Sequence, residues 1–135
     1  MAKGDEDIGA FVTGASKLID LYGYFPSFHD AVVESILIER DGPTVTIRFT
    51  TNDEAYSGGQ VREPDQLAIV VIQWSEVSDL RLSGIDRRNW IDGLTFSVEG
   101  GSIRSELELM DGIEGFILAR RVEIVEVQAE GCSDG

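Results

Sequence analysis

The segment VVESILIERDGPTVTIRFT, residues 32–50, predicts the fold more clearly than any other part of the chain. Its first half, Val32 to Arg40, is rich in β-branched residues, and its second half, Thr44 to Thr50, alternates apolar and polar side chains. Asp41-Gly42-Pro43 lies between the halves and has the composition of a turn. Period-two alternation on both sides of a turn is typical of a β-hairpin, so we expect two antiparallel strands here.

The sequence after this hairpin continues in the same pattern of short apolar runs and turns. Residues 51–65 are polar and predict a long loop, of a length that commonly carries function. Glycine-containing turns then recur about every ten residues, which predicts further strands and no later helix. The expected strands are Gln66 to Trp74, Val77 to Leu82, Leu94 to Val98, Ile103 to Met110, Glu114 to Ala119 and Val122 to Val127.

The N-terminal segment has the spacing of an amphipathic helix from about residue 5 to residue 22. Its apolar residues recur at helical intervals, acidic residues 5–7 suit the positive end of the helix dipole, and Gly23 suits its end. The predicted fold class is therefore α+β, with one N-terminal helix packed on a mostly antiparallel sheet of about eight strands. We expect a single domain over residues 1–135, with an ordered core over about 5–128 and a frayed tail over 129–135.

The composition excludes some functions without indicating one. The chain has 135 residues, with 25 acidic against 11 basic side chains and a formal net charge of -14. Hydrophobic residues make up 42% of it, which is too many for a disordered acidic chain. Such a charge disfavours nucleic acid and anionic membrane surfaces as partners and favours cationic proteins.

The single cysteine and the lack of long apolar runs predict a cytoplasmic protein. Cys132 is the only cysteine, so an intrachain disulfide is impossible. No apolar run approaches the roughly 20 residues that a membrane helix needs, and the N-terminus lacks the apolar core of a signal peptide.

Residues 23–33 contain the side chains most suggestive of chemistry. Ser27, His29 and Asp30 are the residue types of a hydrolase triad, but triad members normally converge from separate segments. In extended chain the side chains of His29 and Asp30 would also point to opposite faces. His29 is the only histidine, which rules out a cluster of imidazole ligands. We therefore predict no catalytic, metal or cofactor site, although an enzyme centred on His29 and Asp30 stays open as an alternative.

A structural role explains the same residues more simply. Pro26 fixes its own backbone angle and separates helix from strand. Ser27 and Asp30 can hydrogen-bond to nearby backbone groups, and His29 can donate and accept at once. Phe25 and Phe28 can close one end of the core.

The stretch GYFPSFHDAVV, residues 23–33, resembles the signature of the immunity protein 50 family. In that family a helix ends in Gly-x-aromatic-Pro-Ser-Phe-His-Asp-Ala, so Gly23, Pro26, Ser27, Phe28, His29 and Asp30 match it, whereas Phe25 stands where tryptophan is usual. The order of the later strands resembles the family as well, over about residues 18–127. The resemblance implies a bacterial protein that neutralises a toxin of a polymorphic-toxin or contact-dependent inhibition system by binding it, without catalysis.

The acidic composition adds a hypothesis about the toxin and the surface that contacts it. A chain of charge -14 suits a basic toxin such as a nuclease. Asp53, Glu54, Glu63 and Asp65 lie on the long polar loop and are the predicted toxin-binding residues. Their spacing does not match a calcium-binding loop. A structural or oligomerising module that uses an exposed strand edge is the third alternative.

Overall fold

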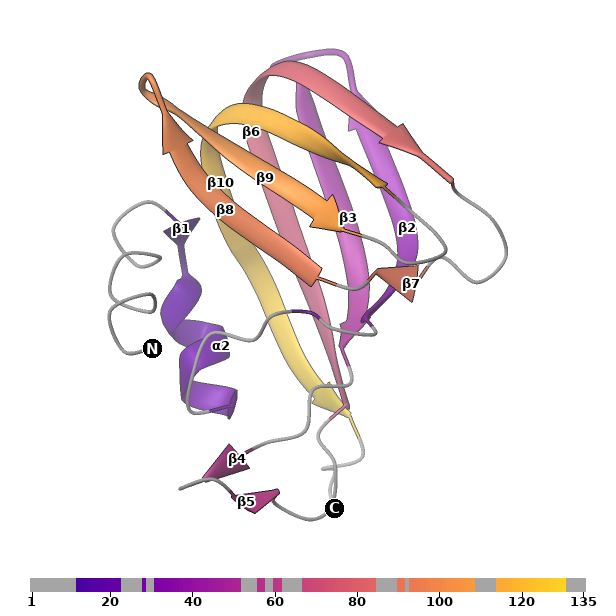
Figure 1. Cartoon of the computed structure of the whole chain (residues 1–135), viewed down its shortest axis with the longest axis vertical. Coiled ribbons are helices and arrows are strands. Elements are labelled where there is room, and N and C mark those ends of the chain that lie inside the picture. The colour runs from indigo at the N-terminus through magenta and orange to yellow at the C-terminus, as the bar shows by residue number, and fades with distance from the viewer. Residues whose placement is uncertain are drawn as a thin grey trace.

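The computed structural model describes residues 12–22, 28, 31–51, 56–57, 60–61, 67–84, 90–91, 93–108 and 114–130. One long sheet, folded over on itself, dominates the molecule, and one short helix packs against it (Figure 1). The elements are β1 (Val12–Thr13), α2 (Ala15–Tyr22), β2 (Ala31–Glu39), β3 (Thr44–Thr51), β4 (Tyr56–Ser57), β5 (Gln60–Val61), β6 (Leu67–Ser83), β7 (Trp90–Ile91), β8 (Gly93–Glu99), β9 (Ser102–Glu108) and β10 (Glu114–Glu130).

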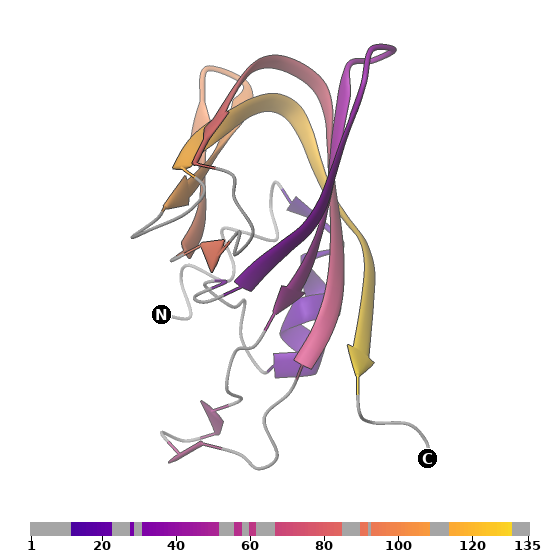
Figure 2. The same ribbon diagram turned by 90° about the vertical axis from the view of Figure 1, so that its right-hand side faces the viewer.

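The sheet follows the strand order β7-β2-β3-β6-β10-β9-β8, and all neighbours along this path are antiparallel. This confirms a mostly antiparallel sheet with one helix, with seven strands along the path and β1 added in parallel to β10. The strands β4 and β5 form a separate small hairpin within the segment predicted as a loop. Because β7 ends at Ile91 and β8 begins at Gly93, the two ends of the path lie close in the chain and the sheet curls on itself (Figure 2).

The hairpin predicted over residues 32–50 is present as β2 and β3, with Ile36 opposite Ile47. The hairpin of β8 and β9 is also present, and Gly100 and Gly101 form its turn with positive φ angles of 57° and 85°. Local alternation and local turn residues are enough to specify both hairpins.

Two predicted interruptions are wrong, because β6 and β10 each replace two expected strands. β6 runs through the position where a break was expected near Ser75, and β10 runs through Arg120-Arg121. The chain bends instead of turning: Glu76 has a φ of 54°, and the pairing of β10 with β6 shifts register near Leu118 and again before Glu126. Such irregularities bend a strand while the pairing continues. Both strands therefore arch from one half of the sheet into the other (Figure 2).

The core lies inside this arch, on the face of the sheet to which every second side chain, mostly apolar, points. The buried side chains of β3 and β6 are Val45, Ile47, Phe49, Thr51, Ala68, Val70, Ile72 and Trp74. Ile103, Ser105 and Leu107 of β9 and Ile117 of β10 are buried as well. The indole Nε1 of Trp74 donates a hydrogen bond of 2.8 Å to the Ser105 hydroxyl, and both residues are fully buried. This bond joins the two halves of the sheet inside the core.

The predicted helix over residues 5–22 is too long. In the described part of this segment, Val12 pairs with Val122 of β10 and the α-helix begins only at Ala15. Gly14 separates the two elements: its φ is 82°, and a Cβ there would lie 2.7 Å from the carbonyl oxygen of Ile124. Helical spacing alone could not show that the strand edge of β10 would pair with Val12.

The helix is held to β10 by apolar burial and by one lysine. Leu18 is fully buried, and Ala15 is nearly so. The Lys17 ammonium donates to the carbonyl oxygens of Ile124 and Val125, at 3.3 Å each. The helix therefore covers backbone acceptors of β10 beyond the part that pairs with β9. At the far end β10 continues to Glu130.

Candidate functional site

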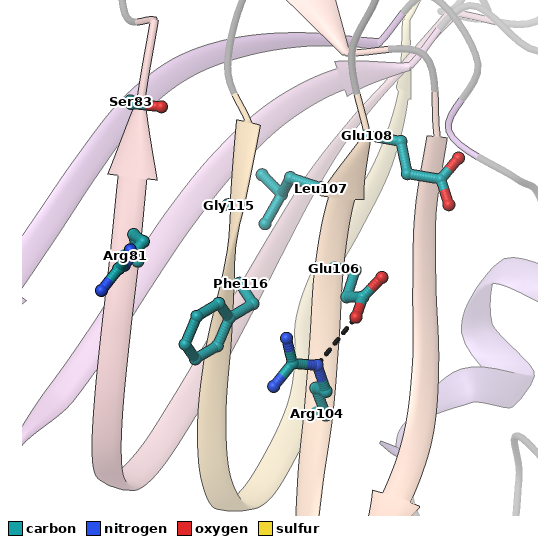
Figure 3. A pocket seen from close by; sticks show the side chains of 8 residues that line it. All are labelled: Arg81, Ser83, Arg104, Glu106, Leu107, Glu108, Gly115 and Phe116. Carbon is teal, nitrogen blue, oxygen red and sulfur yellow. Dashed lines mark hydrogen bonds and ion pairs between the residues drawn. The ribbon is translucent and has the colours of Figure 1, made fainter.

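A hollow of about 580 Å³ lies on the outer face of the folded half of the sheet (Figure 3). It spans three adjacent strands, the C-terminal part of β6, the N-terminal part of β10, and β9. Its lining residues are Arg81, Ser83, Arg104, Glu106, Leu107, Glu108, Gly115 and Phe116. We refer to it as the β6–β10–β9 groove.

The register of the strands explains why charged and aromatic side chains gather there. Phe116 pairs with Arg81 on one side and with Glu106 on the other, so the three residues form one row across the sheet. Directly opposite residues in an antiparallel sheet point to the same face. In the next row Gly115 has no side chain, and a Cβ there would overlap the carbonyl oxygen of Arg81. The groove therefore combines an outward-facing row with a position that only glycine can occupy.

Arg104 is the most constrained polar side chain of the groove. Its guanidinium carbon lies 4.2 Å from the centre of the Phe116 ring, and its Nε donates a 2.7 Å hydrogen bond to the Glu106 carboxylate. The bond to Glu106 raises the pKa of Arg104, and the nearby charges of Glu99 and Asp79 act in the same direction. A guanidinium that is stacked on a ring and paired in this way is held in one orientation.

Arg81 differs from Arg104, because it is exposed and its side chain makes no hydrogen bond or ion pair with other described residues. It lies beside Phe116 and across the groove from Arg104 (Figure 3). Glu108 is an exposed carboxylate farther along β9. Arginine and aromatic residues supply much of the binding energy at protein interfaces. The groove thus offers the chemistry of a protein contact.

The polar side chains that line the groove are those of serine, arginine and glutamate. They include one serine, Ser83, but neither a histidine nor a cysteine. Among the described residues as a whole, no group of three or more histidine, cysteine, aspartate or glutamate side chains is arranged to hold a metal ion. Within the same residues, no helix is long and apolar enough to cross a membrane.

Of the signature residues, the structure describes Phe28. Its ring is fully buried and meets Phe49 edge-on, with centroids 5.2 Å apart and planes at 65°. Phe28 has a φ of 65°, and its carbonyl oxygen accepts a 3.0 Å hydrogen bond from the Ala31 amide. The left-handed backbone turns the chain into β2 while the ring fills the core. Phe28 is therefore part of the buried core.

The other predicted site residues lie outside the described part of the chain. These are Gly23, Pro26, Ser27, His29 and Asp30 of the signature, and Asp53, Glu54, Glu63 and Asp65 of the acidic loop. The roles assigned to them stay predictions.

Sequence reasoning missed the groove altogether. The alternation along β9 places Arg104 and Glu106 on one face of the strand and the buried Ile103, Ser105 and Leu107 on the other face. This alternation can be read from the sequence. What the sequence lacks is the information that Arg81 and Phe116 lie in the adjacent strands, in the same row.

Comparison with models of known protein families gives a match that covers most of the chain. The family model described as immunity protein 50 matches residues 14–129. The chain belongs to the immunity protein 50 family. The match begins at the glycine that separates β1 from α2 and ends one residue before the end of β10, so it includes every strand along the main sheet path. Neither the curated proteins nor the solved structures gave a significant match.

Proposed function

We propose that this immunity protein 50 family member binds a cognate toxin in the bacterial cytoplasm and neutralises it without catalysis. The observation that carries the proposal is the family match over residues 14–129. We further propose that the toxin belongs to a polymorphic-toxin or contact-dependent inhibition system. A protein of this kind acts by occupying a surface that the toxin needs, so its function depends on a rigid and complementary face.

The β6–β10–β9 groove is the described surface best suited to such a contact. Its strands are continuous with the buried core, so the side chains of the row through Phe116 are displayed from a rigid support. The pre-oriented Arg104 would lose little conformational freedom on binding, and Arg81 is exposed and can pair with a carboxylate of a partner.

A basic, nuclease-like toxin is supported by the net charge of -14. We propose that Asp53, Glu54, Glu63 and Asp65 contribute long-range attraction to such a toxin, while the groove supplies short-range contacts. Long-range attraction acts mainly on the association rate and weakens as salt screens it.

The first test is whether a gene beside this one encodes a toxin domain, and that domain is then used for the binding experiments. Cells that express the toxin should survive when they also express this protein, and the purified pair should form a complex. Absence of both protection and binding would refute the assignment as that toxin's immunity protein.

The charge reversal Arg81→Glu should weaken the complex at least about tenfold, as expected for an interface residue of this type. Arg120→Glu, a matched reversal of an exposed arginine on β10 that does not line the groove, should have little effect. Equal affinities of the two variants would exclude the groove as the contact.

The contribution of the acidic loop is tested separately by kinetics. The variant with Asp53→Asn, Glu54→Gln, Glu63→Gln and Asp65→Asn should bind the toxin more slowly at low salt, with a weaker dependence of the rate on salt. Equal association rates for variant and wild type at low salt would remove the electrostatic role of this loop.

A further inference from the structure

One side of β2 pairs with the described part of the chain only near its beginning. The described pairs of β7 with β2 are at Ala31 and Val32, whereas β3 pairs with β2 up to Glu39. From Glu34 to Arg40 the backbone on the other side of β2 has no partner among the described residues. On its other side the hairpin is joined to the sheet, because β3 pairs with β6 up to Thr44 and the Pro43 carbonyl oxygen accepts a 3.1 Å hydrogen bond from the Val77 amide.

The open part of β2 exposes two adjacent large apolar side chains. Leu37 is 54% exposed and Ile38 is 57% exposed, and they point to opposite faces of the strand. Proteins usually protect an open edge with charged side chains, above all lysine, with proline or with a bulge. β2 contains no lysine and no proline, but it carries Glu34, Glu39 and a register shift between Val33 and Ser35. The exposed Leu37 and Ile38 lie between the two glutamates and form the part of this edge that suits pairing with another chain.

The order of residues along this edge favours a second copy of the same chain. We propose that two copies pair antiparallel through β2, around a two-fold axis that passes between the Leu37 residues. A pairing centred on Leu37 runs from Ser35 to Glu39 within β2, with Glu34 and the turn residue Arg40 at its two ends, so the two copies pair without displacing β7. The partner's Leu37 then faces Leu37, and the partner's Ile36 faces Ile38.

The same register also suits the charged residues. The partner's Ser35 lies opposite Glu39, and the partner's Arg40 lies opposite Glu34, so no like charges are paired directly. Shifting the pairing by two residues would place Leu37 opposite Glu39 or Ser35, because residues on the same face must remain opposite each other. The register centred on Leu37 is the one that places each of the three apolar residues opposite another apolar residue.

The proposed dimer is weak, and it is independent of the groove. A single pair of strands buries less than the roughly 800 Å² per partner of a standard interface, so we expect a dissociation constant in the micromolar range or above. β3 lies between β2 and β6, so the groove strands stay outside the dimer contact. Dimerisation can therefore fail while toxin binding succeeds, and the reverse also holds.

The first test is sedimentation of the full chain over a range of concentrations. The wild-type mass should rise from monomer toward dimer between about 10 and 500 µM. Leu37→Lys should raise the dissociation constant at least tenfold, because the ammonium groups would meet across the axis. Val98→Lys is the matched control, since Val98 is 58% exposed and lies on β8 at the other end of the sheet path. A concentration-independent monomer would overturn the proposal, and so would equal weakening by the two variants.

The second test checks the register by disulfide trapping in a Cys132→Ser background. Directly opposite residues in antiparallel strands have Cα atoms about 4.5–5.5 Å apart, which a disulfide can bridge. Leu37→Cys should therefore form a covalent dimer under mild oxidation. Glu39→Cys should not, because its symmetry mate would lie four residues away, at roughly 13 Å. Faster trapping of Glu39→Cys than of Leu37→Cys would refute this register.

Discussion

The hydrogen bond between Trp74 and Ser105 gives the sharpest test of how the folded sheet is held together. The Nε1–Oγ distance is 2.8 Å, and both side chains are fully buried. Ser105→Ala removes the acceptor but leaves the indole N–H in the core. A buried donor without a partner costs about 1–3 kcal/mol. We therefore expect Ser105→Ala to lower the free energy of unfolding by that amount, although the side chain loses only one oxygen.

The double-mutant cycle separates this effect from packing. Trp74→Phe removes the donor and also leaves a cavity, so it should be destabilising by itself. In the double variant Trp74→Phe/Ser105→Ala neither polar group remains unpaired, so the loss should be smaller than the sum of the two single losses by roughly 1 kcal/mol. The measurement is urea unfolding followed by far-UV circular dichroism, because one of the two tryptophans is absent from these variants.

The control is Ser97→Ala, which changes an exposed serine on β8 and should stay within about 0.5 kcal/mol of wild type. A Ser105→Ala variant as stable as the control would show that the bond does not contribute as reasoned. Additive losses in the double variant would show the same.

Two further substitutions test the backbone that shapes the groove and the start of β2. Gly115→Ala would force a Cβ into the Arg81 carbonyl oxygen, so we expect a loss of about 3 kcal/mol or more, or failure to fold. The control is Gly101→Ala, since a Cβ at Gly101 would meet open space. It should lower the free energy of unfolding by only about 1 kcal/mol, because of the φ of 85°. Similar thermal shifts for Gly115→Ala and Gly101→Ala would contradict the steric argument. Phe28→Ala should lose about 3–5 kcal/mol in urea unfolding, because the ring is fully buried against Phe49, and a loss below 1 kcal/mol would show that Phe28 does not close the core.

The sequence-based predictions were correct where a feature depends on residues close together in the sequence, and wrong where it depends on distant segments. The hairpin of β2 and β3 was predicted correctly, because alternation and the turn at Asp41-Gly42-Pro43 lie within the same stretch. The bends of β6 and β10 were mistaken for strand breaks. Glu76 takes a positive φ although it is not glycine, so nothing in the sequence distinguishes a bend from a turn there. The start of the helix was misplaced because Val12 pairs with a strand more than one hundred residues away.

The family signature could be recognised from neighbouring residues, whereas the groove and the edge of β2 could not. The family signature was recognised from residues 23–33, and the family model confirms the family over residues 14–129. The groove was not predicted, since its central row requires Arg81, Phe116 and Glu106 to lie in register on three strands. The extent of the described pairing between β7 and β2 was equally hidden, because it depends on contacts between strands that are distant in the sequence.

The sequence by itself determined the family, the antiparallel character of the sheet and the apolar face of most strands, because these follow from motifs and from a period of two along the chain. Tertiary structure decided where the long strands bend, which residues share a row, and which strands pair with each other. The physical reason is that register and curvature are set by contacts between distant segments, such as Trp74 with Ser105 and Gly115 with the backbone of Arg81.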